Sequence, residues 1–172
     1  AAFDRRLTVV CAPAGYGKTT ATAAALEHRS AVWYKLDILD HDPLAFLAAM
    51  TRAVRRLHPG FGAALLRELE SGPVLDIAPQ VLAAQFCSEC DRLLKAPGHI
   101  VLDDYHETMD AASMNEVLGY LLENCPETVH FVVLTRYQPA FPLEKLRLAG
   151  GVARVAQDRL LFDATQTADV LR

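Results

Sequence analysis

The sequence predicts a three-layer α/β fold in which helices flank a five-stranded parallel sheet. Short runs rich in β-branched and aromatic residues alternate along the chain with longer stretches whose apolar residues recur at helical spacing. Strands that are separated by helices favour right-handed crossovers, and such crossovers produce a parallel sheet. The 172 residues are enough for one domain with a core of its own.

The stretches with strand composition are short and are bounded by turn residues or charges. The third of them is a continuous apolar run that ends in two carboxylates, which is typical of a buried parallel strand. The predicted strands lie at residues 7–10, 31–37, 99–104, 128–134 and 152–155.

The stretches between the strands carry helical patterns. The first is rich in alanine, and the second opens with Asp42 as an N-cap and Pro43 at the first helical position. The predicted helices lie at residues 21–26, 43–57, 61–70, 78–95, 111–124 and 143–148, and a further helix begins at Thr165.

The composition argues against several functional classes. A formal net charge of −4 and a pI near 5.8 provide no basic surface for nucleic acid or for an anionic membrane. No apolar run reaches the roughly 18 residues that a membrane span requires. We therefore expect a cytoplasmic domain that neither binds nucleic acid directly nor associates with a membrane.

The four cysteines do not have the spacing of a disulfide scaffold, so reduced thiols are expected. Cys87 and Cys90 form a CxxC pair, but no second pair and no histidines at ligand spacing accompany it. A buried structural role is therefore favoured over a zinc site or a redox motif.

One stretch, TVVCAPAGYGKTT at residues 8–20, has the order strand, glycine-bearing loop, helix. Gly15 and Gly17 can adopt positive φ, so backbone N–H groups can turn toward a phosphate at the positive end of the helix. Lys18 is expected to face the β- and γ-phosphates, and the Thr19 hydroxyl to bind Mg²⁺. The expected nucleotide-binding residues of this loop are Pro13, Ala14, Gly15, Tyr16, Gly17, Lys18, Thr19 and Thr20.

The loop matches the Walker A pattern GxxxxGK[ST] except at its first position, where Ala12 stands. The alternative is a glycine-rich turn with a chance Lys-Thr pair behind it. The strand before the loop and the helix after it favour the phosphate loop.

Two further strand ends bring polar side chains to the same edge of the predicted sheet. Asp103 would hold Mg²⁺ opposite Thr19, directly or through a water. Asp104 is placed to orient or deprotonate an attacking water, and Arg136 could reach the γ-phosphate. The alternatives are a loop carboxylate for Asp103 and a surface ion pair for Arg136. The expected catalytic residues are Asp104, Lys18 and Arg136, and the expected metal ligands are Thr19 and Asp103.

Four of these stretches together resemble the nucleotide-binding domain of the MalT-like, large LuxR-type transcriptional regulators, which belong to the STAND class of AAA-like P-loop ATPases. They lie at residues 12–20, 33–37, 100–106 and 132–136, and the resemblance covers nearly the whole chain. It implies a single P-loop NTPase domain over residues 1–172, with the start of a following helical module at about 160–172. It also implies a sheet order of 5-1-4-3-2 and a role for Arg136 as sensor arginine.

The resemblance further implies a regulatory switch that uses ATP, ADP and Mg²⁺. In such proteins ADP holds a closed form, whereas inducer and ATP favour an open form that self-associates, with slow Mg²⁺-dependent hydrolysis. DNA and inducer binding lie in other domains, and the absence of an initiator Met leads us to expect a piece of a longer protein.

Two other functions remain as alternatives. One is a small P-loop kinase that transfers the γ-phosphoryl group to a metabolite, with an acceptor pocket formed by residues 42–96. The other is a binding module that no longer uses nucleotide, which the retention of Lys18, Thr19 and Asp103 disfavours.

Overall fold

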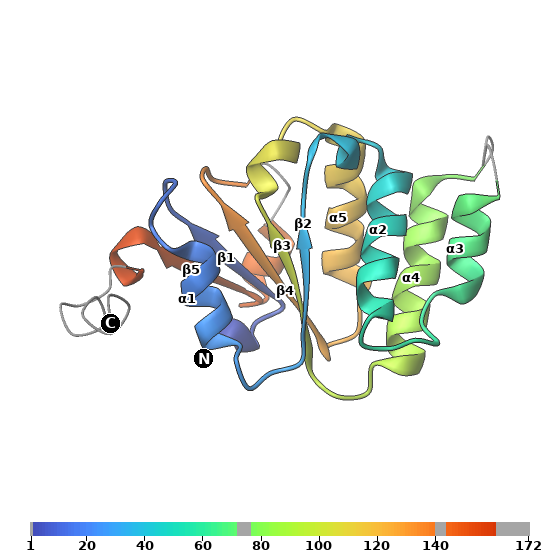
Figure 1. The fold of residues 1–172 in the computed structure, drawn as a ribbon, viewed down its shortest axis with the longest axis horizontal. Coiled ribbons are helices and arrows are strands. Elements are labelled where there is room, and N and C mark those ends of the chain that lie inside the picture. Colours follow the sequence, from blue (N-terminus) through green and yellow to red (C-terminus); the bar gives the residue numbers. More distant parts are fainter. Residues whose placement is uncertain (1, 72–76, 140–143, 161–172) are drawn as a thin grey trace.

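The computed structural model describes residues 2–71, 77–139 and 144–160. The helix expected from Thr165, and most of the expected start of a following module, lie outside these residues. Within them, strands and helices alternate along the chain, as the colour sequence of Figure 1 shows.

The sheet in the described part of the chain consists of β1 (Leu7–Cys11), β2 (Ala31–Lys35), β3 (Gly98–Asp103), β4 (Val129–Thr135) and β5 (Val152–Ala156). Its order is β2-β3-β4-β1-β5, and every neighbouring pair is parallel. Read from the other edge, this is 5-1-4-3-2, so the predicted fold and sheet order are confirmed.

The helices are α1 (Lys18–Ala25), α2 (Pro43–Arg55), α3 (Ala63–Glu70), α4 (Pro79–Leu93), α5 (Ala112–Asn124) and α6 (Glu144–Leu148). Each helix predicted within the described residues is present, with ends shifted by a few residues. None of these described helices is both long and apolar enough to cross a lipid bilayer.

The second strand ends at Lys35, earlier than predicted, because polar capping starts a short 3-10 helix at residues 38–41. The Asp37 carboxylate accepts a hydrogen bond from Leu39 N at 2.7 Å, and Asp40 in turn accepts one from Asp37 N at 2.8 Å. This reciprocal capping box satisfies the free N–H groups of the new helix and turns the chain away from the sheet.

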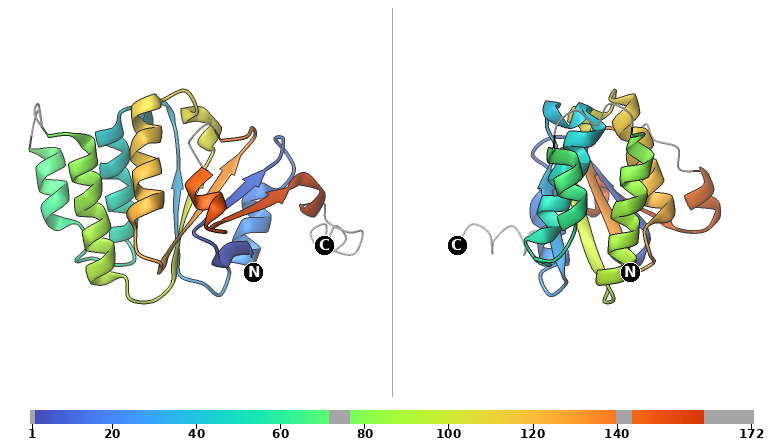
Figure 2. Two further views of the ribbon diagram at one scale, coloured as in Figure 1. Left: turned by 180° about the vertical axis from the view of Figure 1, so that it is seen from behind. Right: turned by 90° about the vertical axis from the view of Figure 1, so that its right-hand side faces the viewer.

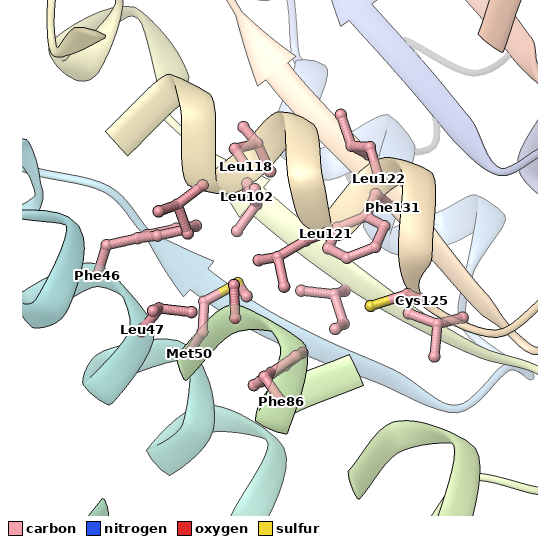
Figure 3. Close-up of a cluster of buried hydrophobic side chains, with 14 of the residues drawn as sticks. Phe46, Leu47, Met50, Phe86, Leu102, Leu118, Leu121, Leu122, Cys125 and Phe131 are labelled. Atoms are coloured by element: carbon pink, nitrogen blue, oxygen red, sulfur yellow. The ribbon is translucent and has the colours of Figure 1, made fainter. Parts of the chain in front are cut away.

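The two faces of the sheet pack against different helices, because successive residues of a strand point to opposite sides. On one face, Leu102 and Phe131 join the large core cluster that includes α2, α4 and α5, and Figure 3 shows these side chains together. On the other face, Val101 and Val132 pack with Leu26, directly after α1. Figures 1 and 2 show α2, α3 and α4 gathered beyond β2, at the far end of the molecule from α1 and β5.

The CxxC pair has the buried position that the sequence predicts. Cys87 and Cys90 lie on α4, and the Sγ atom of Cys87 is 3.5 Å from that of Cys125. The hydrogen bond with the Cys125 thiol raises the pKa of Cys87, so its thiol stays protonated. Among the residues with described positions, no three His, Cys, Asp or Glu side chains are grouped so as to hold a metal ion.

Replacement of Leu118 by alanine should destabilise the domain. This side chain of α5 is fully buried in the large cluster, so the lost burial and the remaining cavity should cost about 3 kcal/mol of unfolding free energy. Leu148→Ala is the matched control, because Leu148 is 90% exposed and its truncation should change stability by less than about 0.5 kcal/mol. Urea denaturation measures both, and equal losses would contradict the core described above.

Candidate functional site

The carboxyl ends of β1, β3 and β4 meet at one edge of the sheet, and a hollow of about 250 Å³ lies there. The last residue of β3 and the segments that follow these three strands supply its lining. The lining residues are Ala14, Gly15, Gly17, Lys18, Thr19, Thr20, Asp103, Asp104 and Arg136. Of the residues expected to bind nucleotide, only Pro13 and Tyr16 are outside this lining.

The loop between β1 and α1 has the backbone that an anion site requires. Gly15 has φ 83° and Gly17 has φ 71°, as expected for the positive-φ glycines of a phosphate loop. Gly17 is also the N-cap of α1, and no side chain caps the first turn of that helix. The free N–H groups of this turn and the helix dipole therefore favour an anion at the hollow.

Lys18 makes contacts that the sequence does not predict. The residue lines the hollow and is 9% exposed. Its Nζ atom donates hydrogen bonds to the carbonyl oxygens of Ala12 at 2.8 Å and Pro13 at 3.0 Å. Both carbonyls belong to the loop that leads into Lys18, so the ammonium group can reach them.

Ala12, the departure from the Walker A pattern, is buried in the smaller core cluster. Its backbone N–H donates to the carbonyl oxygen of Thr135 at 3.2 Å, which continues the pairing of β1 with β4. The methyl group is thus accommodated by packing, and the glycine of the pattern is not required here.

Thr19 and Asp103 are brought together although they are far apart in the sequence. The Thr19 hydroxyl donates to Asp103 Oδ2 at 2.9 Å, and Asp103 Oδ1 accepts a hydrogen bond from Asp104 N at 2.8 Å. Hydroxyl and carboxylate oxygens are ligands that Mg²⁺ prefers. An octahedral Mg²⁺ ion would complete its coordination shell with phosphate oxygens and waters. This pair therefore fits the metal-ligand role expected for it.

Asp104 has a left-handed backbone, with φ 55° and ψ 35°, and among the described residues it is the only one other than glycine with positive φ. Asp and Asn tolerate this conformation better than most residues. Its Oδ2 atom lies 3.1 Å from Lys35 Nζ at the end of β2. This hydrogen bond and the negative charge of Asp104 raise the pKa of Lys35.

Arg136 follows β4 and lines the hollow with an exposed side chain. No acidic side chain of the described residues forms an ion pair with it. Within the part of the chain described here, its guanidinium group is thus available to an anion in the hollow, as a sensor arginine would be.

Sequence reasoning missed the buried polar network behind the two carboxylates. Asn115 on α5 accepts a hydrogen bond from the Tyr105 hydroxyl at 2.6 Å. Its amide donates to the carbonyl oxygens of Thr108 and Met109, both at 3.1 Å. The network fixes the 3-10 helix at residues 105–108, which follows Asp104 directly. The sequence does contain one sign of this network, because Asn115 stands among the apolar positions of the predicted helix at 111–124.

The chain is similar in sequence to two kinds of longer protein. It is 28% identical over 169 residues to the HTH-type transcriptional regulator MalT of Vibrio cholerae, a match that covers 94% of this chain and 18% of that protein. The chain is homologous to MalT-type regulators over most of its length. The serine/threonine-protein kinase PknK of Mycobacterium tuberculosis is 27% identical over 176 residues, which cover 97% of this chain and 15% of PknK. The chain thus spans less than a fifth of these relatives, and no protein-family model matches it.

Solved structures support the fold at much lower sequence identity. A chain of Drosophila ORC bound to AT-rich DNA and Cdc6 superposes with a TM-score of 0.56 at 11% identity, over 96% of this chain and 52% of that one. The Aeropyrum pernix ORC1 protein in complex with DNA gives a TM-score of 0.52 at 15% identity, over 95% of this chain and 42% of that one. Together with the strand order, these likenesses show an AAA+-like P-loop NTPase fold.

Replacement of Asn115 by leucine should destabilise the domain, because the Tyr105 hydroxyl and the carbonyls of Thr108 and Met109 would each lose a hydrogen bond. Each buried group that is left unsatisfied should cost roughly 1 to 3 kcal/mol. Asn124→Leu is the matched control, since Asn124 lies on the same helix and its only side-chain hydrogen bond recorded among the described residues is an exposed one to Tyr120. Thermal and urea unfolding measure both variants, and similar stability for the two would rule out the network as a support of the site.

Proposed function

We propose that the chain is the ATP- and ADP-binding switch domain of a signal-responsive transcriptional regulator, with slow Mg²⁺-dependent ATP hydrolysis. The observation that carries this proposal is the convergence of a phosphate loop, the Thr19–Asp103 pair, Asp104 and Arg136 on one hollow. Homology to MalT, which is an HTH-type transcriptional regulator, supports the regulatory role. In this proposal the domain is cytoplasmic and the full protein self-associates in the ATP state.

The triphosphate would occupy the hollow, with its phosphates on the free N–H groups at the start of α1. Lys18 would exchange the carbonyls of Ala12 and Pro13 for β- and γ-phosphate oxygens, which are stronger acceptors for an ammonium group. Thr19 and Asp103 would hold Mg²⁺, which neutralises phosphate charge when bound. Arg136 would donate to the γ-phosphate and so distinguish ATP from ADP.

Hydrolysis requires that a water attacks the γ-phosphorus while the bond to the bridging oxygen breaks and ADP departs. Asp104 would accept the proton of that water. Two features predict a slow reaction. An Asp side chain is one methylene shorter than a Glu side chain, and the Asp104 carboxylate also forms an ion pair with Lys35. Slow turnover suits a switch, because the ATP state then persists long enough for the protein to self-associate.

A metabolite kinase is less well supported. Such an enzyme needs an acceptor pocket beside the γ-phosphate and arginines over the phosphates. No residue between 42 and 96 lines the described hollow, and Arg52 pairs with Glu70 at 2.6 Å on the helical side of β2.

The first test is to denature the purified chain and identify the nucleotide that it releases. ADP in near one-to-one amount would support a switch that traps its product. If no nucleotide is released, the chain is titrated with ATP and Mg²⁺ and with ADP to test whether it binds them. Failure to bind either nucleotide would refute the proposal.

Lys18→Ala should abolish tight ATP binding while the domain remains folded. The phosphates would lose their main point charge, whereas the fold would lose only two hydrogen bonds to loop carbonyls. Lys95→Ala is the control, because Lys95 is exposed and lies outside the lining of the hollow. Calorimetric titration and circular dichroism measure binding and folding, and an unchanged affinity in Lys18→Ala would contradict the site.

The two carboxylates should separate binding from hydrolysis. Asp103→Asn should weaken Mg²⁺-dependent ATP binding, because it removes charge from a metal ligand. Asp104→Asn should leave the affinity nearly unchanged and lower kcat by roughly 100-fold or more, because it removes the base. Single-turnover kinetics with measured affinities test both, and equal effects on both steps would mean that the two roles are wrongly assigned.

A further inference from the structure

His106 is a buried imidazole that the proposed mechanism does not use. It lies two residues after Asp104, and its side chain is only 7% exposed. Both ring nitrogens are shielded from solvent, and neither has a hydrogen-bond partner among the described residues. Buried polar atoms of native proteins are nearly always paired, so an unpaired imidazole beside a candidate site requires an explanation.

Two carboxylates flank the ring without hydrogen-bonding to it. Nδ1 is 3.9 Å from Asp104 Oδ1, and Nε2 is 3.2 Å from Glu107 Oε1. The Glu107 side chain is 53% exposed and can turn to solvent. The two oxygens of Asp104 thus have different neighbours, since Oδ2 faces Lys35 and Oδ1 faces His106.

The ring also contacts the segment that carries Arg136. Tyr137 packs edge-on against His106, with ring centroids 6.4 Å apart. The backbone of Tyr137 is fixed by Thr135, whose Oγ1 donates to the Tyr137 carbonyl oxygen at 2.9 Å and accepts from its N–H at 3.3 Å. His106 therefore lies between the candidate base and the end of β4.

His106 does not line the hollow, so it can influence a bound nucleotide only through its neighbours. A distance of 3.9 Å is about 1 Å longer than a hydrogen bond, and a small rotation of the Asp104 side chain would close it. The ring itself is enclosed and contacts Tyr137 edge-on. The Asp104 side chain is 27% exposed, so the carboxylate has more room to rotate than the ring.

We propose that His106 is a positioning residue for Asp104, an inference that rests on the proposed function. When ATP and the attacking water occupy the hollow, the carboxylate rotates and Oδ1 accepts a hydrogen bond from Nδ1–H of His106. This bond fixes the orientation in which Asp104 receives the proton of the water.

The test compares His106→Phe, His106→Asn and the matched control His130→Phe in the full chain. Loss of the orienting bond in His106→Phe should lower kcat by about 10- to 100-fold, as for outer-shell partners that orient metal ligands. Affinities for ATP and ADP should stay within about twofold of those of the unaltered chain, because His106 does not line the hollow. His106→Asn places an amide N–H near the position of Nδ1 and should recover part of kcat. His130→Phe is the control because His130 lies at the other end of β4.

A purely space-filling role predicts the opposite pattern. His106→Phe would then leave kcat unchanged. His106→Asn would lower the stability and would not give a higher kcat than His106→Phe. Either result would overturn the inference.

A second readout does not depend on turnover. The ¹⁵N chemical shifts of the His106 ring should change when Mg²⁺ and a non-hydrolysable ATP analogue are added, whereas those of His130 should not. Unchanged His106 shifts in a chain that binds the analogue would refute this inference alone. If the unaltered chain binds no nucleotide, the proposed function fails and the inference falls with it.

Discussion

Because β1, β3 and β4 hydrogen-bond side by side and run in the same direction, their carboxyl ends must meet at one edge of the sheet. Everything in the candidate site follows from this constraint. The phosphate loop, the two carboxylates and Arg136 each begin where one of these strands ends. Thr19 and Asp103 are 84 positions apart in the sequence, and this strand arrangement helps to bring them within hydrogen-bond distance.

Three of the described side chains of the site are already paired within the protein. Lys18 binds carbonyls of its own loop, Thr19 binds Asp103, and Asp104 binds Lys35. A ligand that enters must therefore replace these partners, whereas in the described part of the chain Arg136 and the free N–H groups at the start of α1 are available to it. Since both sides of such an exchange are hydrogen-bonded, the net free energy is a modest difference between large terms. The arrangement favours a preformed pocket whose occupancy responds to small changes in its surroundings.

The sequence predicted the fold and the strand-end residues well, because hydrophobic periodicity and the carboxyl-edge rule act over short stretches. It did not predict the hydrogen-bond partners of side chains that can choose among several polar groups. The end of β2 depends on the mutual capping of Asp37 and Asp40, and the burial of Lys18 depends on carbonyls that only the folded loop brings near. Asn115 was missed because its partners come from the preceding 3-10 helix and its flanks.

The left-handed backbone at Asp104 also limits which acid can stand there. A left-handed conformation costs most residues roughly 1 to 2 kcal/mol, but Asp and Asn recover part of this through local hydrogen bonds of their short side chains. Among the described residues, the Asp104 side chain caps no backbone N–H group and instead pairs with Lys35, so the surrounding structure must hold the strained backbone. The geometry of one peptide unit, set by the way β3 passes into the next helix, thus restricts which residue types can follow Asp103.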